Sequence, residues 1–309
     1  MMLAYLHRGL VHLRKGTLLK RLQSEWHQHT KRRRQAWWES QVGKRRHMEV
    51  RIQPDVRMRL YFDSRLSQAI YCGDFEWRER QFLAAFLRPG DVFVDIGANI
   101  GLYTLSAACR VGDSGHVYAF EPSSNAYHRL MANVQLNRFG NVSCYQLALS
   151  DCVARVDMSI SLDGYDAWNS LAQPIAGNSF AVEPVSCITW EDFAEEHHLA
   201  GRTTLMKIDV EGWESHVLLG GYKMLSRTDA PVLQVEFTEK ANQSAGSSCA
   251  NLYHLLEELG YQMFTYDAKL RKLVPEPLRE SYPYVNLLTA KRPEHIIARL
   301  NRPCLRWLR

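Results

Sequence analysis

A short glycine-containing turn carries the residues best suited to chemistry. It runs from Asp95 to Gly101, directly after the apolar run Val92-Phe93-Val94, and a helical pattern begins at Gly101. Open α/β sheets bind ligands at the carboxyl ends of their strands, beside turns of this kind. Glycine also allows the backbone to approach a ligand closely. We therefore expect a cofactor at this turn.

The spacing within the turn narrows the choice of cofactor. A dinucleotide site needs G-x-G-x-x-G and a phosphate loop needs G-x-x-x-x-G-K-[ST], but Ala98-Asn99 stands where the second glycine would fall. A pyrophosphate ligand, and with it a dehydrogenase, is disfavoured. Asp95 suits a cationic amine, and Glu121, at the end of the next predicted strand, suits the two hydroxyls of a ribose. S-adenosylmethionine, a nucleoside that carries a positively charged amino acid, meets both conditions.

Strands and helices alternate along most of the chain. Apolar runs predict strands at residues 91–96, 116–120, 142–147, 185–188, 205–210, 231–237, 261–266 and 284–290. Helical spacing predicts helices at residues 76–87, 102–109, 124–137, 189–197, 213–225 and 250–260. This order predicts an α/β fold with a doubly wound parallel sheet. The last two strands have no helix between them and should place an antiparallel strand at the edge.

Two further segments have weaker patterns. Residues 49–70 alternate in polarity and should form a hairpin of short strands that turns at Pro54-Asp55. Residues 157–184 should be irregular, and Asp163 to Ser170 within them is a candidate lid or acceptor loop. In that loop, Tyr165 and Trp168 would stack on a sugar face or simply anchor the loop.

Five motifs follow one another over about 200 residues. They are D-I-G-A-N-I-G at 95–101, F-E-P at 120–122, A-L-S-D at 148–151, N-S-L at 169–171 and K-I-D-V-E-G at 207–212. With these motifs, residues 91 to about 292 resemble the FkbM family of S-adenosylmethionine-dependent methyltransferases. The resemblance implies a Rossmann-like class I methyltransferase sheet of seven strands. It also implies methyl transfer, commonly to oxygen on sugars or natural products.

The same resemblance implies three groups of cofactor-binding residues. The loop under the methionine portion would comprise Asp95, Gly97, Asn99 and Gly101. The ribose ligand would be Glu121, and the adenine contact would be Ser150 with Asp151. Simpler interpretations remain open. The glycines would then serve only the turn, and Asp151 would be an ordinary turn residue or helix cap.

The strand predicted at 205–210 leads into a second group of carboxylates. Asp209 and Glu211 are two residues apart and would share one face of an extended chain, unless a turn at Gly212 splays them. One should meet the methionine end of the cofactor and the other the acceptor. For the base that accepts a hydroxyl proton we rank Glu211 first and Glu236 second, with Asp209 as a cofactor ligand. Alternatively, Glu211 caps the helix at 213–225.

The net charge of +5 is unevenly distributed. Residues 1–50 carry 12 Lys/Arg and three Glu, a net charge of +9, and the rest of the chain carries −4. Apolar residues recur at steps of three or four in two runs, Leu3-Leu6-Leu10-Leu13 and Leu18-Leu22-Trp26, which predicts a basic amphipathic helix. Such a helix contacts an anionic membrane, a partner groove or the protein itself. The runs Lys31–Arg34 and Lys44–Arg46 keep nucleic acid binding open.

Composition excludes other classes of protein. No apolar run approaches the ~18 to 20 residues of a membrane span. The seven cysteines form no C-x-x-C pair, so we expect neither a disulfide framework nor a metal site. By pattern the chain divides into a basic arm at 1–48, a small N-terminal cap at 49–88, a cofactor-binding domain at 89–292 and a basic tail at 293–309.

We therefore predict a cytoplasmic S-adenosylmethionine-dependent O-methyltransferase. Its acceptor would be a small molecule, glycan, natural product or lipid, and residues 1–34 offer a peripheral membrane contact. The alternatives are an RNA methyltransferase that uses the arm, and a non-catalytic cofactor-binding protein associated with a membrane. The oligomeric state stays open.

Overall fold

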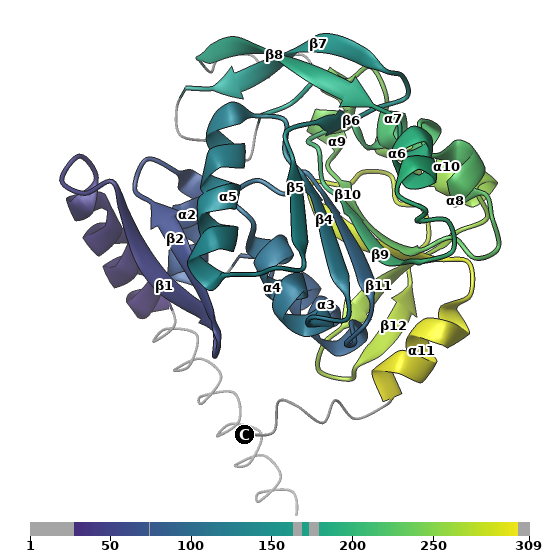
Figure 1. The fold of residues 1–309 in the computed structure, drawn as a ribbon, viewed down its shortest axis with the longest axis horizontal. Helices are drawn as coiled ribbons and strands as arrows, with labels where there is room; N and C mark the ends of the chain where they lie inside the picture. The colour runs from purple at the N-terminus through teal and green to yellow at the C-terminus, as the bar shows by residue number, and fades with distance from the viewer. Residues whose placement is uncertain (1–27, 74, 163–168, 173–178, 302–309) are drawn as a thin grey trace, which may run out of the picture. The chain divides into compact units, whose positions relative to one another are not determined.

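The computed structural model describes residues 28–73, 75–162, 169–172 and 179–301, and it divides into two compact units (Figure 1). One unit comprises residues 1–48 and 60–75, and the other comprises residues 49–59 and 76–309. The leucines of the predicted amphipathic helix lie outside the described residues. Within the described ranges, no helix has both the length and the apolar character needed to cross a membrane.

The first unit packs two helices through aromatic rings. Residues 28–41 are helical, and the ring of Trp38 lies 4.5 Å from that of Phe62 and 5.4 Å from that of Tyr71, measured between centroids. The second helix, α2 (Arg65–Cys72), begins where the Ser64 hydroxyl accepts the N–H of Ser67. The expectation of extended chain up to residue 70 is therefore wrong, because this serine cap starts a helix.

The predicted hairpin is confirmed. Strands β1 (His47–Gln53) and β2 (Val56–Tyr61) pair with each other and turn at residues 54–55. In the second unit, Asn133 anchors part of β2, since its side chain accepts the N–H of Arg59 and donates to the Arg59 carbonyl. The same amide donates to the carbonyl of Ile100 at 2.9 Å, so it also holds the glycine turn.

The second unit is built on an eight-stranded sheet with the order β12-β11-β13-β10-β9-β3-β4-β5. Its strands are β3 (Val92–Ile96), β4 (His116–Phe120), β5 (Val142–Tyr145), β9 (Thr203–Ile208), β10 (Val232–Phe237), β11 (Gln262–Asp267), β12 (Lys272–Pro275) and β13 (Val285–Ala290). Neighbours from β5 to β10 run parallel. The chain order reverses between β3 and β9, which is the switch point at which such sheets bind ligands.

The antiparallel strand is present but lies inside the sheet. Strand β13 pairs antiparallel with both β10 and β11 and separates them, so the edge is formed by β12. Strand β12 brings the sheet from the expected seven strands to eight. It arises because residues 268–271 turn the chain back onto β11, in a segment that we expected to be a loop.

Helices cover both faces of this sheet (Figure 1). On one side lie α4 (Leu102–Val111) and α5 (Ser124–Asn137). On the other lie α6 (Trp190–Glu196), α7 (Glu214–Leu219), α8 (Tyr222–Leu225) and α10 (Cys249–Glu258). We expected a single helix at 213–225, but it is broken at Gly220. A Cβ at Gly220 would lie 1.9 Å from the carbonyl oxygen of Ser150, so this chain crossing requires glycine.

A small second sheet occupies most of the segment 157–184 that we expected to be irregular. It also takes in the strand predicted at 185–188, which we expected in the main sheet. It has the order β6-β8-β7, with β6 (Ala148–Leu149), β7 (Ala154–Ser161) and β8 (Phe180–Ile188), and it lies at the top of Figure 1. Met158 and Val185 are buried between its strands, with Val156 and Ile160 packed against them. The period-two spacing of Val156, Met158 and Ile160 is typical of a strand and was the signal that we overlooked.

Further helices belong to the second unit. They are α3 (Trp77–Phe86), which confirms the helix predicted at 76–87, α9 (Glu239–Ser244) and α11 (Pro293–Asn301). The guanidinium of Arg299 on α11 bonds to the carboxylate of Asp91 and to the carbonyl of Phe86. The last helix is thereby attached to the start of β3.

Candidate active site

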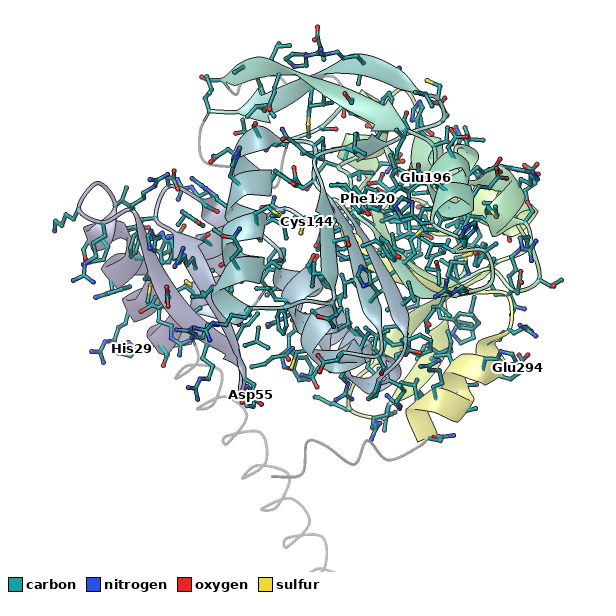
Figure 2. The ribbon with its side chains drawn as sticks, in the orientation of Figure 1. His29, Asp55, Phe120, Cys144, Glu196 and Glu294 are labelled. Atoms are coloured by element: carbon teal, nitrogen blue, oxygen red, sulfur yellow. The ribbon has the colours of Figure 1, made fainter. Side chains whose placement is uncertain are left out.

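The glycine turn after β3 lies directly against the end of β9. Gly97 has φ +80°, and a Cβ there would lie 1.9 Å from the carbonyl oxygen of Asp209. The N–H groups of Gly97 and Ala98 both donate to the carbonyl of Phe120, at 3.0 and 2.9 Å. Phe120 ends β4 and is labelled in Figure 2. The ends of three strands therefore meet at one turn, which leaves no room for a side chain at Gly97.

Glu121 is held by the same turn. One of its carboxylate oxygens accepts the N–H of Asn99 and the other that of Ser123, each at 2.9 Å. Asn99 has a left-handed backbone with φ 48°, and its own side chain accepts the N–H of Ile100. Because each carboxylate oxygen has a further lone pair, Glu121 is oriented to accept two neighbouring hydroxyls.

Asp95 is buried at the end of β3. One carboxylate oxygen accepts the Thr104 hydroxyl at 2.6 Å, and the other has no hydrogen-bond partner among the described residues. Burial raises the pKa of Asp95, and the neighbouring charge of Lys207 opposes that rise. Asp95 therefore has both the charge and a spare acceptor for a cationic group.

Ser150 and Asp151 are linked to the residues after β9. The Ser150 hydroxyl donates to Asp151 at 3.0 Å and accepts the indole N–H of Trp213 at 3.0 Å. The Trp213 ring stacks on His216 with 3.6 Å between centroids. Trp213 follows the K-I-D-V-E-G motif directly, but it was not among the predicted site residues. The indole joins the proposed adenine contact to the carboxylate motif.

Lys207 compensates part of the negative charge at this edge. Its ammonium is buried, 2.6 Å from the Asp209 carboxylate and 4.7 Å from the centroid of the Tyr103 ring. Burial lowers the pKa of Lys207, but the surrounding charges of Asp209, Glu76 and Asp95 outweigh it and the net pKa is raised. The lysine is therefore charged and fixes the orientation of Asp209. This lysine is part of the K-I-D-V-E-G motif, but the motif did not indicate that its ammonium would pair with Asp209.

Asp209, Glu211 and Glu236 are brought together in space. One carboxylate oxygen from each lies within 4.8 Å of those of the other two. Glu211 has φ 53°, so the turn begins at this residue and still keeps the two motif carboxylates close. Burial, with Asp209 as the next cause, raises the pKa of Glu211 well above its ordinary value. Burial followed by the charge of Glu211 does the same for Glu236.

Glu214 holds the turn between β9 and α7. One oxygen of its buried carboxylate accepts the N–H groups of Val210 and Gly212, at 3.0 and 3.2 Å. Burial raises the pKa of Glu214 to about 7. Glu214 therefore holds the turn that precedes α7. The N-cap of α7 is Trp213 and has no side-chain cap hydrogen bond, so the alternative role of Glu211 as cap of this helix is not seen among the described residues.

A further acidic residue, Glu76, lies at the same edge and was missed. One of its oxygens accepts the Tyr284 hydroxyl and, at 3.0 Å, the side-chain amide of Asn286. Asn286 pairs in register with Glu236, and burial raises the pKa of Glu76. These contacts join residues about 200 positions apart, so no local pattern could have revealed them.

The N-S-L motif reaches the carboxylates through Ser170. The Ser170 hydroxyl donates to the carbonyl of Glu211 at 2.7 Å, and the Asn169 side chain accepts the N–H of Ser161. The candidate stacking residues Tyr165 and Trp168 lie outside the described residues. The described part of the candidate loop therefore touches the site at the backbone of Glu211.

Comparison with known proteins decides the family. The model of the methyltransferase FkbM domain matches residues 95–263, more than half of the chain. The chain belongs to the FkbM methyltransferase family. This membership confirms the resemblance drawn from the five motifs.

Individual relatives match more weakly than the family model. "Methyltransferase 1" of Beauveria bassiana (strain ARSEF 2860) is 30% identical over 152 residues, which are 43% of this chain and 59% of that protein. The crystal structure of methyltransferase FkbM from Methylobacillus flagellatus KT has 15% identity and a TM-score of 0.41, covering 72% of this chain and 54% of that one. M. jannaschii TYW2 in complex with AdoMet has 14% identity and a TM-score of 0.39, covering 79% and 84%.

The cofactor of this family member is S-adenosylmethionine, and the described residues fit it. Asp95 keeps an unpartnered buried oxygen for a cationic group. Glu121 is oriented by two backbone N–H groups toward a pair of hydroxyls. At Gly97 the chain presents backbone, and no side chain, to the space between Asp95 and Glu121.

The close contact at Gly97 generates a first prediction. Gly97→Ala should abolish binding of S-adenosylmethionine, because the added Cβ overlaps the Asp209 carbonyl and the backbone is left-handed. Calorimetric titration of the full chain with S-adenosylmethionine and S-adenosylhomocysteine measures this. The matched control is Gly140→Ala, since nothing lies within 4 Å of a Cβ at Gly140. Unchanged affinity in Gly97→Ala would contradict this account of the turn.

Glu214 generates a second prediction, on stability. Its pKa rises from 4.5 to about 7 on folding, so the folded chain binds this proton more tightly than the unfolded chain does. Its contribution to stability is complete below pH 4.5 and is lost as the pH rises through about 7. We expect Glu214→Gln to flatten the fall in the free energy of unfolding between about pH 5 and about pH 8. Denaturant unfolding at several pH values measures this, with the exposed Glu257→Gln as a control that keeps the wild-type slope. A Glu214→Gln slope equal to the wild-type slope would refute the assignment.

Proposed function

We propose that this chain transfers a methyl group from S-adenosylmethionine to a hydroxyl oxygen of its acceptor. The observation that best supports this is the half-buried carboxylate of Glu211, which lies beside Asp209 at the switch-point edge of the main sheet. Family membership supports methyl transfer, and the choice of oxygen as the receiving atom rests on this carboxylate.

S-adenosylmethionine, when bound, supplies a methyl group on a sulfonium, which is already an activated leaving group. The protein must then mainly hold the acceptor oxygen ~3 Å from the methyl carbon, in line with the bond that breaks. As the acceptor oxygen takes the methyl group that S-adenosylmethionine would supply, leaving S-adenosylhomocysteine, Glu211 accepts the hydroxyl proton. The raised pKa of Glu211 makes it a stronger base than an ordinary carboxylate.

The neighbouring carboxylates differ in access and therefore in proposed role. Glu236 is 2% exposed and takes second place as base, because an acceptor reaches the more exposed Glu211 first. Asp209 is bonded to Lys207, and we propose it as a ligand of the cofactor's methionine end. Ser150 and Asp151 remain the proposed adenine contact, and Gly101, which has φ +95° and begins α4, belongs to the proposed loop under the methionine portion.

The acceptor and the cellular setting are part of the same proposal. We propose a small molecule, a glycan or a lipid-linked hydroxyl as acceptor, in keeping with the resemblance to FkbM enzymes. We also propose that the basic arm draws the enzyme to an anionic surface, since Lys31, Arg32 and Arg33 are exposed on the helix at 28–41.

Co-sedimentation of the full chain should be stronger with phosphatidylserine vesicles than with phosphatidylcholine vesicles, and weaker at high salt. Equal recovery with both vesicles would contradict this, and strong salt-dependent RNA binding would favour the RNA alternative.

The role of Glu211 can be tested by a change that removes only the base. Glu211→Gln should lower kcat by about 100-fold or more, because the amide cannot accept the proton, and should leave affinity for S-adenosylmethionine within a few-fold. Transfer of labelled methyl groups to panels of glycans, lipids and RNA identifies an acceptor and then measures the rate.

Two controls accompany this test. The exposed Glu257→Gln should keep the wild-type rate, and Glu121→Ala should lose both cofactor binding and transfer. The rate of the wild type should fall on acidification at a higher pH than the ordinary glutamate pKa of 4.5, because the base must be ionised. A Glu211→Gln enzyme with the wild-type rate would move the role of base to Glu236 or eliminate it.

A further inference from the structure

The carboxylates after β9 and β10 are spaced as ligands of one small cation. Asp209, Glu211 and Glu236 each place an oxygen within 4.8 Å of the other two. Oxygen ligands of Mg²⁺ or Ca²⁺ lie about 2.0 to 2.6 Å from the ion, so two of them are at most roughly 5 Å apart. Three carboxylate oxygens at this separation can therefore share a single ion.

A second observation, independent of the acidic composition, points to a ligand. Glu236 is 2% exposed, and its Oε1 accepts the Thr238 hydroxyl at 3.1 Å. Its Oε2 is fully buried and has no hydrogen-bond partner among the described residues. A buried carboxylate oxygen without a partner is costly, which indicates that a donor or a cation belongs beside it.

The balance of charge indicates how much positive charge is missing. Lys207 is 2.6 Å from Asp209 and offsets the charge of that carboxylate. Glu211 and Glu236 then remain as two negative charges, with further carboxylates at Glu214 and Glu76 nearby. Two uncompensated carboxylates match one divalent ion better than one ammonium group.

We propose that Asp209, Glu211 and Glu236 bind one divalent cation of the kind that prefers oxygen ligands, such as Mg²⁺ or Mn²⁺. All three ligands are carboxylates, which suits these ions better than the softer transition metals. We expected no metal site, because we had considered only cysteine and histidine ligands. The three carboxylates are separated by up to 27 positions in the chain and meet only after folding.

The role of the ion in catalysis rests on the proposed function. A bound divalent ion lowers the pKa of a hydroxyl or water that it coordinates. It would therefore hold the acceptor hydroxyl beside Glu211 and favour loss of its proton. A glutamate that binds the ion through one oxygen keeps the other oxygen free to accept that proton.

Mn²⁺ binding to the full chain tests the inference without any acceptor. After treatment with EDTA and its removal, Mn²⁺ is titrated into the protein and free Mn²⁺ is measured by electron paramagnetic resonance. The wild type should bind one equivalent of Mn²⁺ saturably. Glu236→Gln should weaken that affinity by more than about tenfold, since even second-shell changes cost about this much. The exposed Glu257→Gln is the matched carboxylate-to-amide control and should bind as the wild type does.

Thermal unfolding separates loss of the site from loss of the fold. Glu236→Gln removes a buried charge without changing the size of the side chain, so without metal it should melt at the wild-type temperature or above it. Mn²⁺ should raise the melting temperature of the wild type and of Glu257→Gln but not that of Glu236→Gln. Absence of saturable binding by the wild type, or equal binding by Glu236→Gln, would overturn the inference.

The experiments distinguish failure of the metal site from failure of the proposed function. Methyl transfer that continues unchanged in EDTA, by a chain that does not bind Mn²⁺, would remove the metal site and leave the proposed function standing. Mn²⁺ binding that depends on Glu236, in a chain that methylates no hydroxyl acceptor, would support the metal site and overturn the proposed function.

Discussion

The buried ammonium of Lys207 is the interaction on which the carboxyl edge of the main sheet depends. It lies in register with Asp95 on β3 and Gln234 on β10, and it bonds to Asp209 just beyond its own strand. Without this lysine, the acids Asp95 and Asp209 would lie at this edge without compensation, which is costly in a region of low polarity. The lysine therefore allows the strands to carry carboxylates where the cofactor and the acceptor are expected to meet.

One lysine does not balance the whole edge. Glu211, Glu236, Glu214 and Glu76 all have raised pKa values, and burial is the largest cause for each of them. Such an arrangement costs stability and is typical of sites that act on a ligand. The raised pKa values belong to these acids without a cation, and the proposed divalent ion would compensate their charge when bound. The imbalance links the stability of this edge to its chemistry.

Local pattern was sufficient for the regular part of the fold. Strand β4 and helix α5 have the bounds that apolar spacing predicted, and the hairpin turns at Pro54-Asp55 as expected. The predictions of secondary structure failed where one residue, such as a helix cap or a glycine, overrode the pattern of the longer segment around it. Ser64 began a helix within an alternating segment, and Gly220 divided a helix because another chain passes beside it. Strand β13 entered the sheet between β10 and β11, because the order of strands depends on packing and not on order in the chain.

The sequence by itself determined the α/β class, the glycine turn at Asp95 to Gly101 and the family, because each is written in contiguous residues with characteristic spacing. It also singled out Asp209, Glu211 and Glu236 as candidate acids of the site. Only the tertiary structure decided that these three meet within 4.8 Å, that Glu214 holds the turn before α7, and that Glu76 lies close enough to affect the pKa of Glu211. Contacts between distant residues depend on the register of neighbouring strands and on which groups become buried. Neither property has a local signature, since both arise only when the sheet is assembled.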